Sequence, residues 1–422
     1  MPKVSIILTS FNHDTYIGES IDSVLGQTFT DFELIIWDDA STDGSWSVIE
    51  SNSDPRIRAF RNEEHKRPIY GVIKAISEVA AGEYIAMHHS DDVWSSDKLE
   101  KQVAYLDGHP DIGAVFSDAL AIGEDGLVLD DEHHFYSNIF AQPNRTRHEW
   151  LRFFFSHGNA LCHPSMLIRK HCYEDCGIYR YGFAQIGDMD MWVRLCLKYD
   201  IHVLPEKLVS FRVRDNEANT SGNRPEVRVR AYFEYFQVLS NYLDIGSFDD
   251  LVQVFPESQQ YFRGKDTVIE FALAMTVLDL KPFYFSILFA LNVLFELITD
   301  DIAARRLADT YGFDYKAFIV LTGKHDPFQV MQFERLTNEA SERDLEISGL
   351  KQTVSELSRT VSEQDLQIAE LSRTVTEQDM QIDGFKLALA ERDITIRAMH
   401  ESHSWKLTAP LRAASRLVKK AP

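Results

Sequence analysis

The sequence predicts an α/β fold in its first half, with a doubly wound, Rossmann-like and mostly parallel sheet. Short apolar runs alternate with segments whose apolar residues recur at helical spacing, as in Val4–Leu8 followed by Tyr16–Gln27. A continuous apolar run is typical of a strand buried on both faces, and strands that alternate with helices form parallel sheets. Ligands of such sheets bind beyond the carboxyl ends of the strands. This directs attention to Thr9–Asn12, Asp38–Asp43 and Ser90–Asp92.

The remaining elements follow from the same periodicities. We expect strands at Val4–Leu8, Phe32–Trp37, Arg56–Phe60, Tyr84–Met87, Ala114–Asp118 and His202–Leu204, and helices at Tyr16–Gln27, Ser45–Ser51, Tyr70–Ala80 and Met191–Lys198. A stretch rich in Asn, Thr, Ser, Gly and Pro, Asn216–Pro225, marks a boundary. We therefore expect an α/β domain over residues 1–222, a helical domain over 223–333, a coiled coil over 334–400 and a basic amphipathic tail over 401–422.

Composition narrows the class of protein. The chain has 422 residues, too many for one compact domain, and 45% of them are hydrophobic, which is enough for a sizeable core. Its formal net charge is −22, from 65 acidic and 43 basic residues. Because a protein that binds nucleic acid over a large surface is basic, we expect no nucleic-acid partner.

Three features bear on the cellular compartment. The four cysteines, Cys162, Cys172, Cys176 and Cys196, match no zinc-ligand spacing, and we interpret them as reduced thiols of a cytoplasmic protein rather than a redox pair at Cys172 and Cys176. The N-terminus enters a strand pattern at once, without a secretory signal. The apolar stretch Phe283–Ile298 is shorter than the ~20 residues that span a bilayer, so we expect a buried helix there.

From Leu336 onward the apolar residues follow a heptad pattern. The a positions are Val354, Val361, Ile368, Val375 and Ile382, and leucines 350, 357 and 371 fall at d, with glutamines at d positions 364 and 378. Glu356–Ala369 and Glu370–Asp383 match at 11 of 14 positions, so the duplication keeps the heptad register. A single exposed helix cannot bury so long a seam. We therefore expect a coiled coil that joins two or three copies of the chain.

The last stretch, Ser404–Pro422, reverses the charge of the chain. Its basic residues are Lys406, Arg412, Arg416, Lys419 and Lys420, and it contains no acidic residue. Trp405 and the leucines supply apolar surface, and Pro410 limits the tail to two short amphipathic helices. Such a tail can bind an anionic membrane surface reversibly. The alternative is a frayed, solvated basic end.

Three groups of acidic residues follow strands or open a helix in the α/β half. They are Asp38–Asp43, Asp91–Asp92 and Asp188–Asp190. Taken singly, they read as turn formers, loop residues and a helix N-cap. Together they offer carboxylates for a hard divalent cation and for deprotonating a hydroxyl. Because adjacent carboxylates cannot both enter an apolar core, a metal ion or ligand is the natural partner of Asp91–Asp92.

The order of several motifs along the first half is specific. Val4–Asn12 is followed in register by Ser20–Phe29 and Glu33–Asp43, and Gly82–Ile85 leads to Ser90–Asp92. This order resembles glycosyltransferase family 2 over roughly residues 3–215, and the spore-coat-type members in particular, which lack the first acid of the usual DxDD. The resemblance implies a GT-A fold and an inverting transfer from a nucleotide sugar by single displacement.

The resemblance also implies a nucleotide site. Phe11 would stack on the base, Asp39 would accept the imide hydrogen of the base, and Thr9 would lie beside the nucleotide. Asp91 would lie at the ribose. An arginine often contacts the nucleotide in this family, and Arg67 is the nearest candidate, with surface charge as its alternative role.

The same resemblance implies the reacting groups. Asp92 would bind the Mg²⁺ or Mn²⁺ that bridges the diphosphate, and Asp188 would be the general base. His163 is similar to a family element near the acceptor side, although a lone histidine is more often structural. Arg212 and Arg214 follow the last strand, where the family often places Arg and His near the diphosphate.

The sequence departs from the family pattern at several positions. His89 stands where many members have Asp, Thr9 replaces the usual Pro, and Phe11 replaces the usual Tyr. Lys74 occupies a position that is commonly Asn, and Arg214 stands in place of a His. These departures put in doubt the carry-over of individual contacts.

These expectations combine into an enzyme that moves a sugar from a UDP- or dTDP-sugar to a hydroxyl of a polysaccharide or lipid-linked glycan at the inner face of the cell membrane. The tail Ser404–Arg412 resembles that of bacterial enzymes of surface-polysaccharide assembly. The alternatives are a non-catalytic oligomeric scaffold and a membrane-organising adaptor. The joint presence of Asp39, Asp92 and Asp188 favours the enzyme, because a scaffold needs no carboxylates at strand-end loops.

Overall fold

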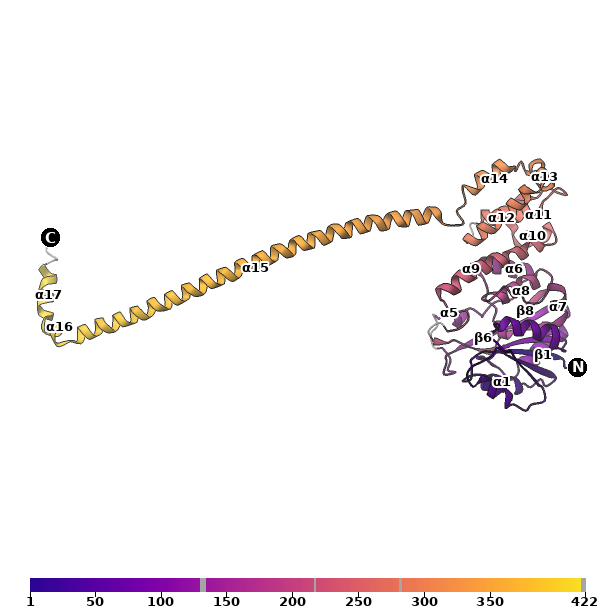
Figure 1. Cartoon of the computed structure of the whole chain (residues 1–422), viewed down its shortest axis with the longest axis horizontal. Helices are drawn as coiled ribbons and strands as arrows, with labels where there is room; N and C mark the ends of the chain where they lie inside the picture. The colour runs from indigo at the N-terminus through magenta and orange to yellow at the C-terminus, as the bar shows by residue number, and fades with distance from the viewer. Residues whose placement is uncertain (130–133, 216–217, 281–282, 419–422) are drawn as a thin grey trace. The chain divides into compact units, whose positions relative to one another are not determined.

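The computed structural model describes residues 1–129, 134–215, 218–280 and 283–418. Among them, one sheet has eight strands in the order β3-β2-β1-β4-β7-β6-β8-β5. The strands are β1 (Val4–Ser10), β2 (Phe32–Asp38), β3 (Ile57–Arg61), β4 (Tyr84–His89), β5 (Val93–Trp94), β6 (Ile112–Ile122), β7 (Leu167–Arg169) and β8 (Asp200–Arg212). The sheet lies within the first half of the chain (Figure 1), which confirms the predicted α/β class.

Helices cover both faces of the sheet. One face carries α1 (Ile17–Leu25), α2 (Ser45–Glu50) and α4 (Lys98–Gly108), and the other carries α3 (Pro68–Lys74), the π-turn η1 (Ala75–Val79), α6 (Arg147–His157), α7 (Lys170–Cys176) and α8 (Gly187–Cys196). In β1, Val4, Ile6 and Leu8 pack towards α1 and α4, whereas Ile7 packs towards α3. Since both faces are buried, the strand is apolar at successive positions, as its sequence predicts.

The sheet is parallel in its first half and mixed in its second. β3, β2, β1 and β4 pair in parallel. β7 is antiparallel to both β4 and β6, β8 runs parallel to β6, and β5 runs antiparallel to β8. The expected mostly parallel sheet therefore describes the first four strands, and the remainder is mixed. A run of apolar residues encodes burial but does not encode strand direction.

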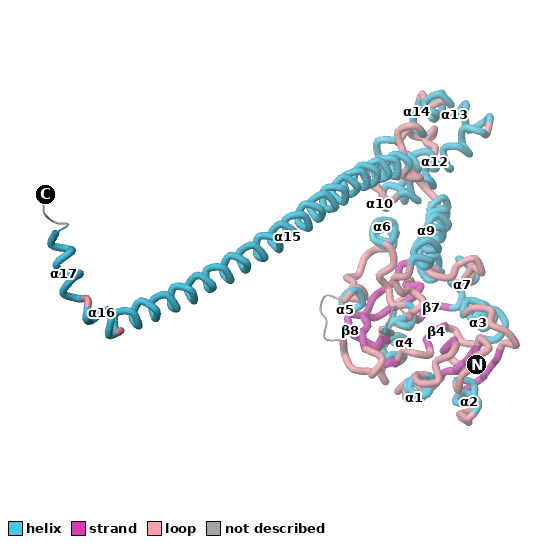
Figure 2. Tube along the Cα trace, turned by 60° about the vertical axis from the view of Figure 1, so that its left-hand side comes forward, coloured by secondary structure: helices cyan, strands magenta, loops and turns pink. Residues whose placement is uncertain are grey.

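Within the described residues up to 329, six α-helices follow the sheet, without a strand among them (Figure 2). They are α9 (Pro225–Ser240), α10 (Phe248–Val254), α11 (Ile269–Asp279), α12 (Tyr284–Thr299), α13 (Asp301–Tyr311) and α14 (Tyr315–Thr322), with short 3₁₀ turns at Asn241–Asp244 and Pro256–Tyr261. One apolar cluster contains Trp150 of α6 and Trp192 of α8, which pack on the sheet, together with Val238, Phe271 and Leu294 of these helices. Residues 1–329 therefore form one compact unit.

The apolar stretch at 283–298 forms α12, a buried helix of this unit. Phe289, Ala290 and Leu294 are at most 2% exposed, and the helix has 16 residues. No helix in the described part of the chain combines the length and apolarity that crossing a bilayer requires. The expectation of a buried helix is confirmed.

The cysteines are free thiols. Cys162, Cys172 and Cys196 are buried, and Cys176 is half-buried. Burial raises the pKa of the Cys172 thiol to about 12, which disfavours the reactive thiolate. This agrees with structural thiols rather than a redox pair.

The second unit, Val330–Pro422, begins with α15, a single helix of 72 residues (Val330–Glu401). At 1.5 Å per residue its length is about 108 Å. The heptad seam lies on its surface: the a and d side chains named above are between 48% and 65% exposed. The long helix agrees with the predicted coiled coil, and the association of copies stays a prediction.

Two short helices, α16 (His403–Leu407) and α17 (Ala409–Val418), follow, with Pro410 in the first turn of α17. This is the division expected from that proline. The guanidinium of Arg412 lies 3.6 Å from the centroid of the Trp405 ring. Lys419 and Lys420 of the predicted basic tail lie outside the described residues.

Candidate active site

The carboxyl ends of β1, β2 and β4 lie side by side. The register pairs Thr9 with Trp37 on one side and with His89 on the other. The loop after β2 is tied to β1, because the backbone N–H of Asp39 donates to the carbonyl of Ser10 at 2.8 Å. The acidic segments after β2 and β4 therefore meet at one edge of the sheet, as the motif order predicts.

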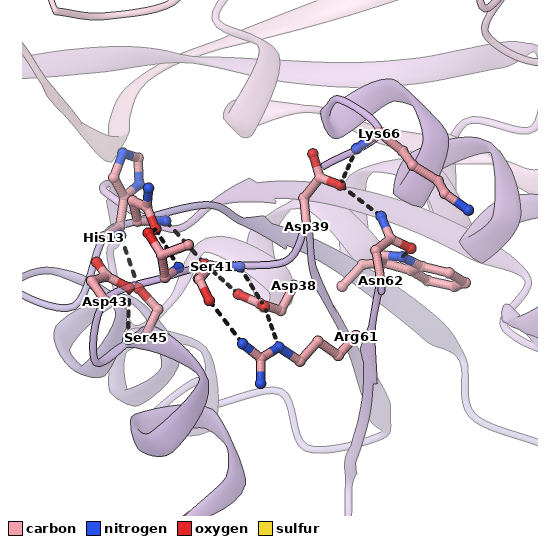
Figure 3. Close-up of polar contacts among 12 residues, drawn as sticks. His13, Asp38, Asp39, Ser41, Asp43, Ser45, Arg61, Asn62 and Lys66 are labelled. Carbon is pink, nitrogen blue, oxygen red and sulfur yellow. Dashed lines mark hydrogen bonds and ion pairs between the residues drawn. The ribbon is translucent and has the colours of Figure 1, made fainter. Parts of the chain in front are cut away.

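Asp39 is buried at this edge, with only 3% of its surface exposed. Its Oδ1 accepts hydrogen bonds from Asn62 Nδ2 at 2.6 Å and from the backbone N–H of Lys66 at 2.8 Å (Figure 3). Its Oδ2 lies 2.9 Å from Nδ1 of His65 but has no partner of good hydrogen-bond geometry. The next residue, Ala40, has a φ of 61°, so the chain turns sharply after Asp39.

The neighbouring acids of this segment are occupied within the protein. Asp38 is fully buried and accepts from the hydroxyl of Ser41 at 2.5 Å, with Arg61 Nε at 3.3 Å (Figure 3). Asp43 Oδ1 accepts from the backbone N–H of Ser45, the first residue of α2, at 2.9 Å. These contacts fold the loop, and they leave Asp39 as the acid of the segment that lies at the edge with Oδ2 weakly satisfied.

The His65 ring lies next to Asp39 and contacts a second ring. The ring of Phe11, which is half-buried, lies 4.2 Å from that of His65 between centroids, at 36°. Thr9, also half-buried, is the last residue but one of β1. The predicted nucleotide residues Thr9, Phe11 and Asp39 thus follow neighbouring strand ends, and His65 joins two of them.

Arg67 and Lys74 are placed differently. Arg67 is exposed and has a φ of 72°. It is the residue immediately before α3. Lys74 forms an ion pair with Glu78 one turn later on the surface. The structure therefore places Lys74 in a surface ion pair and leaves Arg67 exposed.

The loop after β4 holds a cluster of possible metal ligands. One atom from each of His89, Asp91 and Asp92 lies within 4.8 Å of the others. Asp92 is 1% exposed; its Oδ1 accepts from the backbone N–H of Arg212 at 2.8 Å, and its Oδ2 has no hydrogen-bond partner among the described residues. Burial raises the pKa of the Asp92 carboxyl. An orphaned, desolvated carboxylate oxygen beside two further ligands fits a hard divalent cation.

A chain of rings continues from this cluster. His89 Nδ1 lies 3.4 Å from Asp92 Oδ2, its Nε2 lies 3.3 Å from His163 Nδ1, and His163 Nε2 lies 2.8 Å from the hydroxyl of Tyr179. Burial lowers the pKa of His163 well below its usual value, so this imidazole is neutral. Burial opposes the charge on His89, but the nearby carboxylate of Asp92, with the charges of Asp91 and Asp188, raises the pKa of His89. His163 thus lies next to the predicted metal residues.

Asp188 lies in the first turn of α8, across from this loop. Its Oδ2 accepts from Asn159 Nδ2 at 2.6 Å. Burial raises the pKa of its carboxyl to about 6, opposed by backbone hydrogen bonds and by the charge of His89. A carboxylate whose pKa approaches neutrality is matched to proton removal at physiological pH.

Asp190, two residues later, has a different role. It is fully buried and forms ion pairs with Arg180 and with Arg194, whose Nη2 lies at 2.9 Å. It also accepts from Asn241 Nδ2 at 2.9 Å, which ties α8 to the turn after α9. Asp190 is thus a structural carboxylate beside the candidate base.

Arg212 is almost completely buried, and its donors are engaged by the protein. Nε donates to the carbonyl of Asp91 at 2.8 Å, Nη1 donates to the carbonyls of Gly123 and Glu124, and Nη2 pairs with Glu19 at 2.8 Å. The side chain therefore fixes the loop that carries the acidic cluster.

Arg214 lies in a half-buried group with His13. Its Nη1 is 3.0 Å from Nε2 of His13, whose Nδ1 is 2.8 Å from the hydroxyl of Ser90. Its Nε is buried and has no hydrogen-bond partner among the described residues, with Glu124 3.7 Å away. Arg214 therefore retains a donor beside the loop that holds Asp91.

Several residues of this edge escape sequence reasoning. Asn62, His65 and Asn159 touch Asp39 or Asp188, and His13 reaches Ser90. None belongs to a motif that the acidic pattern singles out. The one local signal is that Asn62 and His65 follow the end of β3, the same edge of the sheet.

Comparisons with known proteins identify the family of the chain. Residues 5–170 match the family model described as glycosyl transferase family 2. The chain is similar to the putative teichuronic acid biosynthesis glycosyltransferase TuaG of Bacillus subtilis (strain 168), at 36% identity over 56% of this chain and 88% of that protein. It is similar to the putative glycosyltransferase EpsE of the same strain, at 30% identity over 46% of this chain and 66% of that protein.

A shorter match reaches a glycosyltransferase with a more specific name. This is the UDP-Glc:alpha-D-GlcNAc-diphosphoundecaprenol beta-1,3-glucosyltransferase WfaP of Escherichia coli, which is 36% identical over 25% of this chain and 42% of that protein. The matched regions lie in the half of the chain that holds the sheet and the acidic edge. The chain belongs to glycosyltransferase family 2 and is a glycosyltransferase with a GT-A fold.

Proposed function

We propose that the enzyme transfers a sugar from a nucleotide sugar to a hydroxyl of a lipid-linked glycan, with inversion, a divalent cation and Asp188 as general base. The observation that carries the proposal is that two buried carboxyl groups, Asp92 and Asp188, both act on the charge of His89. Burial raises the pKa of each carboxyl to about 6. Their partners differ, because Asp92 lies with His89 and Asp91 in a set that could hold a metal ion, whereas Asp188 accepts from Asn159. Buried carboxyl groups with raised pKa values and different partners indicate separate roles in a reactive site.

The residues after β4 fit Mn²⁺ or Mg²⁺. Asp92 would hold the cation by a carboxylate oxygen, with Asp91 and His89 beside it. A bound cation of this kind neutralises the charge that develops on the departing diphosphate. Arg212 is a positioning residue for this site. Its Nε donates to the backbone carbonyl of Asp91, and its backbone N–H donates to Oδ1 of Asp92.

Asp188 supplies the proton acceptor. The carboxylate takes the proton of the acceptor hydroxyl while the hydroxyl oxygen forms a bond to the anomeric carbon, and the bond from that carbon to the diphosphate breaks. The nucleoside diphosphate leaves with the bonding electron pair. Asn159 Nδ2 donates to Oδ2 of Asp188 at 2.6 Å and the backbone N–H of Met189 donates to Oδ1 at 2.7 Å, so each oxygen retains a second lone pair that can accept the hydroxyl proton.

The group around Asp39 would hold the nucleoside. Asp39 would accept the imide hydrogen of a uracil or thymine base through Oδ2, and Phe11 with His65 would pack on the base. Thr9 and Asp91 would lie at the base and the ribose. Arg214 has a free Nε donor, and Arg67 lies at the rim, so both could meet phosphate oxygens.

The acceptor side of the proposal rests on the relatives. The name of WfaP gives a diphosphoundecaprenol-linked sugar as its acceptor, and that of TuaG gives teichuronic acid biosynthesis. We extend from these names to a lipid-linked glycan, with His163 on the acceptor side. An acceptor anchored in the inner face of a membrane requires the enzyme to work at that surface, where the basic tail would bind.

The test is nucleotide release from a panel of UDP-, dTDP- and GDP-sugars with Mn²⁺. We expect release of UDP or dTDP, accelerated by a glycosyl diphosphate lipid and abolished by EDTA. Absence of release from every sugar, with or without acceptor, would identify the chain as a non-catalytic scaffold instead.

A further inference from the structure

The first helix after the α/β half is built into the wall beside Asp188. Glu234 of α9 is 1% exposed, and its carboxylate accepts three backbone N–H groups: those of Ala184, Gln185 and Ile186, at 2.8 to 2.9 Å. These residues immediately precede α8, whose second residue is Asp188. Because the Glu234 carboxylate accepts hydrogen bonds from three consecutive backbone N–H groups, it fixes the segment before α8 against α9. In this way α9 sets the position of the candidate base.

The next residue of α9, Tyr235, places its hydroxyl in the same corner. Its ring stacks on Phe285 of α12, with centroids 5.0 Å apart at 12°. Its hydroxyl oxygen lies only 2.6 Å from where a Cβ on Gly158 would stand, and Gly158 has a φ of 82°. Two features therefore require a glycine at position 158: its positive φ, and the close approach of the Tyr235 hydroxyl, which leaves no room for a Cβ. The residue after it, Asn159, donates to Asp188.

The Tyr235 hydroxyl is near the candidate base but is not used by the protein. Burial, and then the negative charge of Asp188, raise the pKa of the phenol, so it remains a hydrogen-bond donor. The hydroxyl makes no hydrogen bond with any residue in the part of the chain that the structure describes. Tyr235 is half-buried. A phenol hydroxyl at such a position that no described protein group engages is available to bind a ligand beside the reacting group.

We propose that Tyr235 recognises the acceptor sugar, by donating a hydrogen bond to a hydroxyl adjacent to the one that Asp188 deprotonates. The inference rests on the proposed transferase function and deepens its acceptor side. The ligand is a glycan with neighbouring hydroxyls, and the fixed ring would select their configuration. Glu234 acts indirectly, by holding the segment before α8 against α9.

The test compares Tyr235→Phe with Tyr232→Phe in the full chain. Tyr232 lies one turn earlier on α9, is 58% exposed and also contacts the Phe285 ring, so it controls for loss of a phenol hydroxyl on this helix. The acceptor probes are octyl diphosphates of Glc, GlcNAc, Gal and GalNAc. The readouts are the acceptor KM, kcat, and the affinity for UDP with Mn²⁺.

We expect Tyr235→Phe to raise the acceptor KM on the order of tenfold, the loss of one hydrogen bond, with UDP affinity unchanged. Tyr232→Phe should have the wild-type KM. The differences in acceptor KM among the four probes should be smaller for Tyr235→Phe than for the wild type. A KM for Tyr235→Phe equal to that of Tyr232→Phe, or a wild type that transfers to water but binds none of the probes, would overturn the inference. A wild type that releases no nucleotide from any donor would instead remove the proposed function.

Discussion

At the residue scale, two of the acidic segments divide their carboxylates between structure and ligand. Asp38 is held by Ser41 and Arg61, and Asp190 is held by arginines. Asp39 keeps one oxygen without a hydrogen bond among the described residues, and Asp188 is held by no cation but by Asn159 and the backbone of Met189. Removing a buried, paired carboxylate destabilises the fold, because its partners lose their own hydrogen bonds. Substitutions of neighbouring acids should therefore separate folding from binding.

Asp92→Ala should abolish the Mn²⁺-dependent part of UDP binding. A hard cation then loses the carboxylate oxygen of the His89, Asp91 and Asp92 cluster that has no hydrogen-bond partner among the described residues. Calorimetry with UDP, with and without Mn²⁺, measures the difference. Asp97→Ala is the matched control, since Asp97 lies in a surface ion pair with Lys101 close by in sequence. Equal Mn²⁺-dependent affinity in wild type and Asp92→Ala would remove Asp92 from the metal site.

The sequence identifies the acids of the site better than their partners. Asp39, Asp92 and Asp188 follow strand ends or open a helix, and those positions can be read from periodicity and motif order. Asn159 and Tyr235 reach the site only because α6 and α9 pack against α8, which no local pattern encodes. The sequence places Arg212 on the phosphate side. In the structure its guanidinium N–H groups donate to backbone carbonyls and to Glu19.

At the element scale, α9 links the helices after the sheet to the segment before α8. Glu234→Gln should lower kcat with little change in UDP affinity, because the amide presents N–H donors to the backbone N–H groups that Glu234 now accepts. We expect the free energy of unfolding to fall by about 1–3 kcal/mol. Denaturant unfolding and steady-state kinetics measure both effects.

The control is Glu226→Gln at the exposed start of the same helix, where the side chain is 62% exposed and pairs with Arg224. If Glu234→Gln matched Glu226→Gln in stability and kcat, α9 would not hold the segment before α8.

The elements themselves were foreseen to different degrees. The first four strands and their helices follow from buried apolar runs, whose pattern reports burial directly. The antiparallel insertion of β7, only Leu167–Arg169, could not be foreseen, because its three residues are too few to show a period. β8 extends to Arg212, well past the expected His202–Leu204, and three consecutive exposed residues, 205–207, interrupt its apolar pattern.

At the scale of the whole molecule, the chain consists of a compact unit, Met1–Gln329, and a helical unit that buries little. Truncation after Gln329 should give a monomer that still releases nucleotide, because every candidate site residue, Tyr235 included, lies within the compact unit Met1–Gln329. Light scattering measures the mass. In the full chain, Ile368→Lys at an a position should weaken association, whereas Ala369→Lys, one residue outward, should not. An unchanged oligomer after truncation would show that α15 does not assemble the protein.

The tail after Ser404 should hold the enzyme at anionic lipid in a salt-sensitive manner. Arg412 packed on Trp405 presents a cation and an aromatic ring together, a combination suited to the interface. Joining two or three tails through α15 multiplies a weak affinity. Flotation with anionic and neutral liposomes, with and without residues 404–422, measures it. Binding that survives deletion of the tail, or no binding to anionic liposomes, would refute this role.

The central claim is that a buried carboxylate at position 188 removes the proton of the acceptor. The measurement is kcat against pH at saturating donor and Mn²⁺, for wild type and Asp188→Asn. The raised pKa of Asp188 means that the group is protonated and inactive below about 6, so wild-type kcat should fall as the pH drops through that value. Asp188→Asn should keep UDP affinity, lose on the order of 10²–10⁴ in kcat, and lose the acid limb. A variant that turns over within a few-fold of wild type, with the same pH dependence, would contradict the account.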